Sequence, residues 1–154
     1  MITVKEANIA EAEAIILNED IYDRIADDTC KPREEVNNFR DLGILFDNYE
    51  WYAGYVNGNL ASLLWIFEDM DVDFMVLPSY RRHARKLFDS SIEKLRPTER
   101  SNMWCSIPTC YRAVINFAKK RGFTESGIEE KAYKKRGVFY NNIILIYTGK
   151  LCQE

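Results

Sequence analysis

The 154-residue sequence has a single histidine, His83, and its four cysteines form no Cys-x-x-Cys pair. A structural zinc site needs four ligands at recognisable spacing, and a Ser-His-Asp or Cys-His triad needs a histidine base. The sequence therefore predicts no metal site and argues against both kinds of triad. Free cysteine usually behaves as a small buried hydrophobe, so we expect reduced core thiols at Cys30, Cys105, Cys110 and Cys152.

Long apolar runs are also missing. The chain has no stretch of about 18 apolar residues, and its N-terminus lacks the basic-then-apolar profile of a signal peptide. We therefore expect no membrane span, no export and a cytoplasmic location. The net charge of −3 and the pI near 5.4 argue against direct nucleic-acid binding, because nucleic-acid binders usually carry a basic domain.

What the chain does have is ample material for one core. Hydrophobic residues make up 47% of it and aromatic residues 13%, and no repeat, low-complexity tract or linker interrupts it, so we expect a single domain over residues 1–154. Strand-like and helix-like blocks alternate. The expected strands span 2–7, two runs within 51–67 around the Asn57-Gly58 turn, 71–78, 102–107, 122–135 and 138–148; the expected helices begin after Asn8, at Tyr80 and after Pro108.

The helix predicted over 80–95 begins with four cations, Arg81, Arg82, Arg85 and Lys86. A helix N-terminus carries unpaired N–H groups and a partial positive charge, so it favours anions over basic side chains. A bound anion would reverse the local electrostatics and make these cations favourable. The alternative is a solvated basic face.

The order of the elements and two motifs resemble the GNAT superfamily of acyl-CoA-dependent N-acyltransferases. The first motif is "MVLPSYRRHARKLFDSSIEKL" at 75–95, a strand followed by proline and a basic helix, and the second is "VINFAKKRGF" at 114–123, a late helix closed by Gly-Phe. The resemblance implies an α/β (α+β) fold with a mixed, mostly antiparallel central sheet flanked by helices. It also implies transfer of an acetyl group from acetyl-CoA to an amine.

The segments "ILNEDIYDRIADD" at 16–28 and "VLPSYRR" at 76–82 look most like small bacteriophage-encoded members of the superfamily. That resemblance would place the protein in a host cytoplasm or in a virion.

In the superfamily, a strand end and the following helix N-terminus hold the pyrophosphate of acetyl-CoA. Two positions depart from the pattern: Lys86 replaces a small residue of the pyrophosphate loop, and Ala118 stands where many members have the tyrosine that protonates the leaving thiolate. Both departures favour an alternative, a catalytically degenerate GNAT-fold binding or structural protein in a virion or against a host protein. The cofactor-binding residues that the resemblance implies are Met75, Val76, Leu77, Arg81, Arg82, His83, Ala84, Arg85 and Lys86. The candidates for binding the ribose 3′-phosphate of coenzyme A are Lys120 and its neighbours Lys119 and Arg121.

Acyl transfer to an amine needs a group that takes the amine's proton and a donor that polarises the thioester carbonyl. Asp71 and Asp73 are two apart in a predicted strand, so both project to one face. A carboxylate on an otherwise apolar strand costs stability unless it is solvated, paired or used. We predict Asp73, ahead of Asp71, as base or acceptor-binding group; the alternative for Asp71 is a surface strand end. Tyr111 is predicted to replace the missing general acid or else to pack, and the resemblance places the polarising N–H near Val76 or Leu77.

The acceptor side of this fold would be walled by the first helix and the hairpin, and an acidic rim there would attract an amine. An ordinary soluble helix is equally acidic, so the acceptor stays open between a small polyamine-like molecule, a protein lysine or N-terminus, and a modified nucleobase. Exposed edge strands in the C-terminal hairpin would allow a homodimer. The residues expected to face the acceptor are Asp20, Asp23, Asp27, Asp28, Trp51 and Tyr52.

Overall fold

The computed structural model describes residues 1–149, so the predicted thiol at Cys152 lies outside the described residues. Among those residues, Cys30, Cys105 and Cys110 are free thiols, of which only Cys105 is buried. The elements follow in the order β1 (Ile2–Glu6), α1 (Ile9–Ile16), α2 (Glu19–Ile25), β2 (Glu50–Val56), β3 (Asn59–Ile66), β4 (Val72–Val76), α3 (Ala84–Ile92), α4 (Pro97–Arg100), β5 (Trp104–Pro108), α5 (Arg112–Lys120), β6 (Phe123–Lys135) and β7 (Val138–Tyr147).

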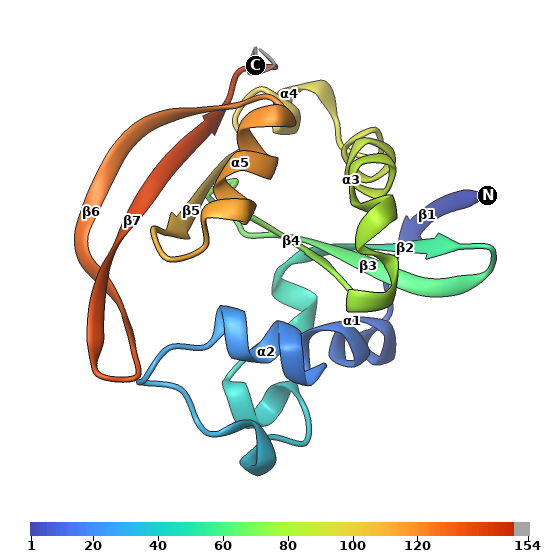
Figure 1. The fold of residues 1–154 in the computed structure, drawn as a ribbon. Coiled ribbons are helices and arrows are strands. Elements are labelled where there is room, and N and C mark those ends of the chain that lie inside the picture. The colour runs from blue at the N-terminus through green and yellow to red at the C-terminus, as the bar shows by residue number, and fades with distance from the viewer. Residues whose placement is uncertain (150–154) are drawn as a thin grey trace.

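The strands form two antiparallel sheets that touch at one corner. One sheet has the order β1-β2-β3-β4 and the other β5-β7-β6. Their contact is a single parallel bridge between Asp71 and Trp104, where the Trp104 N–H donates to the Met70 carbonyl at 3.1 Å. Beyond this corner β5, β6 and β7 turn away from β4 (Figure 1). The predicted mostly antiparallel sheet flanked by helices is confirmed, and its centre is split.

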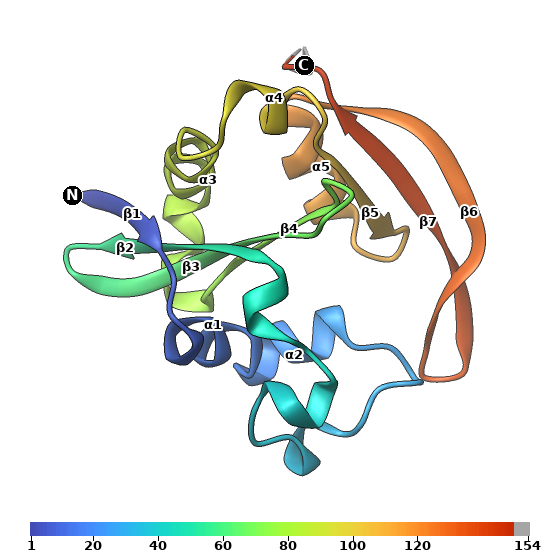
Figure 2. The ribbon, with the colours of Figure 1, turned by 180° about the vertical axis from the view of Figure 1, so that it is seen from behind.

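Helices cover both faces of the first sheet. Figures 1 and 2 show α3 on one side of β1–β4, with α1 and α2 on the other. The α1 and α2 face holds a core that includes a stack of aromatic rings, with ring centroids 4.6 Å apart for Trp51 and Trp65 and 4.4 Å apart for Trp65 and Phe67. The opposite face packs against α3 and α5 through residues such as Leu64 and Ile66 of β3.

Local signals in the sequence account for several element boundaries. Asn8 and Glu11 form the predicted capping box, with 2.8 Å and 2.9 Å bonds between each side chain and the other residue's N–H. Asn57 and Gly58 both take positive φ, 49° and 81°, in the turn of the β2–β3 hairpin. The helix that follows β4 carries its buried side chains at Leu87, Phe88, Ser91 and Ile92, as its apolar periodicity predicts.

Three boundaries differ from the predictions. The first helix breaks in two, because the Asn18 side chain accepts hydrogen bonds from the N–H groups of Asp20 and Ile21 and starts a new helix there. The helix predicted from 80 begins as a 3-10 turn over Pro78–His83 and becomes α-helical only at Ala84. The short helix α4 was not predicted; Pro97 begins it and the Glu99 side chain bonds back to the Arg96 N–H at 3.0 Å.

Candidate active site

The divergence of β4 and β5 leaves a cavity of about 340 Å³ between the two sheets. Its walls come from α2, β4, the turn before α3, β5, the start of α5, β6 and β7. Segments that lie far apart in the sequence therefore meet here. Three residues predicted as catalytic, Asp71, Asp73 and Tyr111, all line this one cavity.

One wall of the cavity is the outer edge of β4. The Leu77 N–H donates to the Ala61 carbonyl of β3 at 2.8 Å, so it is already used by the sheet. In an antiparallel pair the backbone groups point alternately to the partner and away from it. Phe74 and Val76 therefore turn their N–H and C=O groups toward the split. Of the two predicted polarising donors, Val76 stays available and Leu77 does not.

Asp73 lies on β4 opposite Trp65 of β3 and lines the cavity. No described residue donates a hydrogen bond to its carboxylate, and burial alone raises its pKa from 3.8 to about 6. A carboxyl group with this pKa is partly protonated near neutrality. It is therefore able to take up a proton at physiological pH.

Asp71 lies one step along the same face, beside the corner where the sheets meet. Burial, followed by the negative charges of Asp73, Asp69 and Glu129, raises its pKa from 3.8 to about 7, and the Val72 N–H opposes the shift. Asp71 therefore lies in the lining of the cavity, and its catalytic role stays a prediction. The two aspartates form a pair in which ionisation of one disfavours ionisation of the other.

Three polar residues that the sequence did not single out share this cavity or its edge. The Ser106 hydroxyl of β5 donates to a Glu129 carboxylate oxygen of β6 at 2.9 Å. Asn142 of β7 lies opposite both Pro108 of β5 and Glu129, and its Oδ1 atom is fully buried without a hydrogen-bond partner among the described residues. Their positions follow from strand register, and no local motif in the sequence marks them.

Tyr111 precedes α5 and turns its hydroxyl toward Tyr133 of β6, with 2.9 Å between the oxygens. The Tyr133 hydroxyl also lies 3.1 Å from the carbonyls of Arg24 and Ala26, which can only accept. Because Tyr133 has one proton and gives it to a carbonyl, Tyr111 donates to Tyr133. Burial and this contact with Tyr111 raise the pKa of Tyr133. Ala118, where a tyrosine is usual, is buried in the apolar core.

The four predicted helix cations separate in the structure. Arg81 lines the cavity, whereas Arg85 and Lys86 line a different hollow together with His83 and the chain start. Arg82 is exposed and its Nε donates to His83 Nε2 at 3.3 Å. Arg81 therefore faces a different space from Arg85 and Lys86, and the binding of a cofactor's phosphates by these cations stays a prediction. Ala84 begins α3 at the same turn, close to Arg81 in sequence.

The cations at the end of α5 are engaged elsewhere. Lys119 pairs with Glu125 at 2.6 Å, and Arg121 pairs with Asp89 of α3 at 3.0 Å. Lys120 is exposed on α5 and does not line the cavity. The predicted 3′-phosphate contacts of Lys119 and Arg121 would have to compete with these ion pairs.

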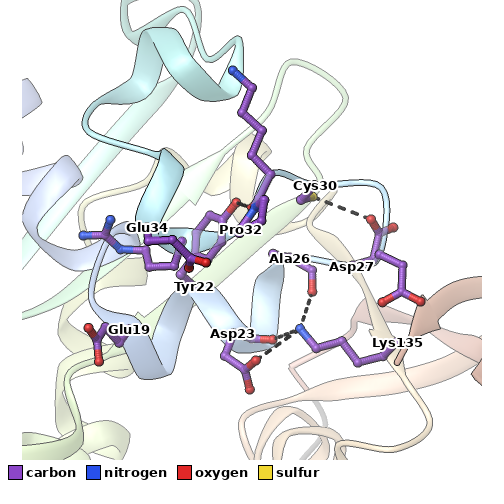
Figure 3. Close-up of a pocket in the computed structure, with 12 residues that line it drawn as sticks. Glu19, Tyr22, Asp23, Ala26, Asp27, Cys30, Pro32, Glu34 and Lys135 are labelled. Carbon is purple, nitrogen blue, oxygen red and sulfur yellow. Dashed lines mark hydrogen bonds and ion pairs between the residues drawn. The ribbon is translucent and has the colours of Figure 1, made fainter. Parts of the chain in front are cut away.

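The tip of the β6–β7 hairpin is fastened to the segment after α2. The Asp28 carboxylate accepts the N–H groups of Arg136 and Gly137 at 2.8 Å and 2.9 Å, and the Asp28 N–H donates to the Lys134 carbonyl at 2.9 Å. Lys135 donates to the Ala26 carbonyl at 2.8 Å (Figure 3). We call this set of contacts the hairpin clasp. It holds the tip of the β6–β7 hairpin against the loop that follows α2 (Figure 1).

A second hollow of about 680 Å³ lies on the outer side of the hairpin clasp. Lys135 extends across it to the Asp23 carboxylate at 3.4 Å, and Asp27 accepts from Cys30 (Figure 3). Of the residues predicted to face the acceptor, Asp23, Asp27 and Asp28 line this outer hollow. Trp51 does not belong with them, because it is 4% exposed within the aromatic stack.

Two features are absent from residues 1–149. No group of three or more histidine, cysteine, aspartate or glutamate side chains is placed to hold a metal ion within that range. No helix within it is long and apolar enough to cross a bilayer.

Comparison with known proteins gives matches only at the level of structure. No protein-family model matches the sequence, and no curated protein matches it. Solved structures match over nearly the whole chain. An acetyltransferase of the GNAT family from Streptococcus pneumoniae is 20% identical with a TM-score of 0.62, covering 99% of this chain and 100% of that one. The chain has the GNAT fold.

Two other matches with this fold contain a coenzyme. A Salmonella typhimurium protein with acetyl-CoA as cofactor is 17% identical with a TM-score of 0.67, covering 94% of this chain and 91% of that one. Spermidine N-acetyltransferase from Vibrio cholerae, in complex with CoA and spermine, is 11% identical with a TM-score of 0.69, covering 94% and 93%. The GNAT fold that the two sequence motifs implied is thus confirmed.

Proposed function

We propose that the protein is an N-acetyltransferase that moves an acetyl group from acetyl-CoA to an amine. The observation that supports this most directly is the meeting of an unpaired strand edge with a half-buried carboxylate pair. Phe74 and Val76 offer free backbone groups on one wall of the cavity, and Asp71 and Asp73 project into the same space. A donor and a proton acceptor are the two groups that acyl transfer to an amine requires.

The residues present fit the proposed cofactor. Acetyl-CoA, when bound, supplies an acetyl group activated as a thioester. The exposed edge of β4 can pair with the amide groups of an extended chain as a further strand would, and the Val76 N–H is the available donor toward a carbonyl oxygen. Arg81, which forms no ion pair with any residue of 1–149, stands at the turn before α3 where a phosphate would be favoured.

The carboxylate pair performs the proton transfer. An amine that arrives as ammonium must lose one proton before it can attack as a nucleophile. The nitrogen must lose a further proton after it bonds to the acetyl carbon. Asp73 accepts this proton because its pKa of about 6 leaves it largely ionised at pH 7–8. As the carbon–sulfur bond breaks, the leaving thiolate needs a proton in turn. Tyr111, whose proton is held by Tyr133, is the hydroxyl that lines the cavity near the start of α5.

The acceptor that this geometry favours is an amine on a small molecule. The hairpin clasp joins β6 and β7 to the segment after α2, which ties together two of the elements around the cavity. A protein lysine or N-terminus would have to displace these contacts. The homodimer through the outer strand β6, the bacteriophage origin, the cytoplasmic location and the single domain over 1–154 stay predictions.

Thermal unfolding with and without acetyl-CoA tests the proposal first. A ligand at about 100 times its dissociation constant stabilises the native state by about 2.7 kcal/mol, which corresponds to a rise in Tm of about 5–10 °C for a chain of this size. Release of free thiol from acetyl-CoA in the presence of small amines then reports transfer. The absence of both a shift in Tm and a heat of binding would contradict the proposal and would favour the degenerate GNAT-fold alternative.

A further inference from the structure

The short helix α2 turns different faces to the two hollows on either side of it. Residues three and four apart share one face of a helix, so each hollow takes one such set. The outer hollow takes Glu19, Tyr22 and Asp23, and the cavity between the sheets takes Ile21, Arg24 and Ile25. Of the seven residues of α2, Arg24 is therefore the one charged residue that lines the cavity.

The Arg24 guanidinium is uncommitted within the described part of the chain. It forms no ion pair with any residue of 1–149, although Asp20 lies one helical turn before it. Arg24 is exposed, so a ligand can reach it. Its carbonyl lies 3.1 Å from the Tyr133 hydroxyl, which ties the end of α2 to the β6 wall of the cavity. The backbone of Arg24 is therefore held at the cavity while its cationic side chain stays available to an anion.

Asp73 projects toward the side of β4 that α2 covers. Asp73 lies directly opposite Trp65 in the β3–β4 pair, so the two side chains share a face of the sheet. Trp65 packs in one core cluster with Ile21, which belongs to the same face of α2 as Arg24. Phe74 alternates with Asp73 and packs on the α3 side instead. The proposed proton acceptor and the Arg24 cation therefore lie on the same side of β4.

The charged residues in the cavity lining are two carboxylates and two guanidinium groups, those of Asp71, Asp73, Arg24 and Arg81. The proposed function places a cofactor phosphate at Arg81, which leaves Arg24 as the cation that faces the acceptor. A molecule with an amine at Asp73 and an anion at Arg24 is attracted at both positions. A second ammonium group near Arg24 would be repelled, and this repulsion disfavours a polyamine.

We propose that Arg24 binds an anionic group of the acceptor, so that the acceptor is an amine that also carries a carboxylate, such as an amino acid, and not a polyamine. The inference rests on the proposed function and names its acceptor class. A guanidinium group holds a carboxylate through two parallel N–H bonds, which fixes the direction of the molecule as well as its charge. Arg24 exchanges no proton in this role; it presents the amine nitrogen to Asp73.

Four probes that share one carbon chain isolate the effect of the second charged group. The reference is n-pentylamine. L-norleucine adds a carboxylate at the carbon that bears the amine, 6-aminohexanoate adds one at the far end, and 1,5-diaminopentane adds a second ammonium group there. Release of free thiol from acetyl-CoA measures kcat/KM for each probe, and calorimetry with coenzyme A present measures each Kd.

The variants are Arg24→Gln, Arg24→Glu and the matched control Arg40→Gln, whose residue is exposed and lines a different hollow. Wild type should prefer at least one of the two amino acids to n-pentylamine about tenfold or more in kcat/KM, as for a hydrogen bond between charged groups. Arg24→Gln should lose this preference and bind that amino acid about tenfold more weakly. Arg24→Glu should prefer 1,5-diaminopentane, and Arg40→Gln should keep the wild-type order.

The outcomes separate the inference from the proposed function. Weaker binding of the amino acid to Arg24→Gln, with no acetyl transfer by any form of the protein, would support the inference and contradict the transferase proposal. Active transfer with no preference for either amino acid in wild type would overturn the inference alone. An unchanged preference in Arg24→Gln, or an equal loss in Arg40→Gln, would overturn it in the same way.

Discussion

Replacing Asp73 by asparagine should stabilise the protein at pH 8, leave it nearly unchanged at pH 4, and slow acetyl transfer. The Asp73 carboxylate lines the cavity, no described residue donates to it, and burial raises its pKa from 3.8 to about 6. Asparagine has the same shape without the charge. The substitution therefore removes the free-energy cost of an ionised carboxylate in this cavity. It also removes the proposed proton acceptor.

The sign and size follow from the pKa. Because the pKa of Asp73 is raised on folding, its contribution to stability is fully present below about pH 3.8 and is lost as the pH rises through 6. One pKa unit corresponds to about 1.36 kcal/mol, so ionisation at pH 8 costs the native state up to about 3 kcal/mol. Water in the cavity screens the charge, and we expect a gain of about 2 kcal/mol in the asparagine variant, or about 4–8 °C in Tm.

Urea unfolding at pH 4 and at pH 8 measures this difference, with Glu93→Gln as control. Glu93 is an exposed carboxylate at the end of α3, and its substitution should change the free energy of unfolding by less than about 0.5 kcal/mol at either pH. Transfer to an amine should fall about 10²- to 10⁴-fold in kcat/KM for Asp73→Asn. Equal effects on stability at the two pH values, or a loss at pH 8, would refute the reasoning.

Three further changes test other parts of the structure. Arg81→Glu should weaken acetyl-CoA binding about tenfold, measured by calorimetry. Arg85→Glu should leave this binding unchanged, because the Arg85 side chain lines another hollow. Equal losses of affinity in the two variants would contradict the separation of these cations. Gly54→Ala should destabilise the protein by about 1–3 kcal/mol in urea melts, because its Cβ would lie 2.1 Å from the Ser62 hydroxyl; wild-type stability would show that this side chain moves aside. Asp28→Ala should speed hydrogen exchange at the two hairpin N–H groups that Asp28 accepts, and unchanged protection would mean that the hairpin clasp does not depend on it.

Predictions from the sequence were accurate where one short segment decides the outcome. The capping box at Asn8 and Glu11, the Asn57-Gly58 turn and the apolar face of α3 are local patterns, and the structure has all three. The two motifs at 75–95 and 114–123 led to the GNAT fold although no family model matches the chain. The break at Asn18 was missed because a polar cap and a continuing helix look alike until the tertiary packing is known.

The sequence could place the candidate residues along one strand but not across strands. Asp71 and Asp73 follow from alternation within β4, so the sequence could place both on one face. Leu77 was wrong as a free donor because its N–H bonds to Ala61, a contact that depends on the register of β3 and β4. Asn142 went unnoticed, since a single asparagine in an apolar strand carries no motif.

The sequence by itself determined most of the segments that become helices and strands, α4 and the break at Asn18 excepted, and it placed the carboxylates and cations on them, because those outcomes depend on side chains within a few residues of one another. The tertiary structure alone decided that β4 and β5 part after one bridge, that Arg81 faces the resulting cavity while Arg85 does not, and that Asn142 joins Asp73 there. The physical reason is sequence separation. Strand register is fixed by pairs such as Ile2 and Val56, which are 54 positions apart, and the path of the hairpin clasp by pairs such as Asp28 and Arg136, which are 108 apart. Periodicity within one segment carries no information about either kind of pair.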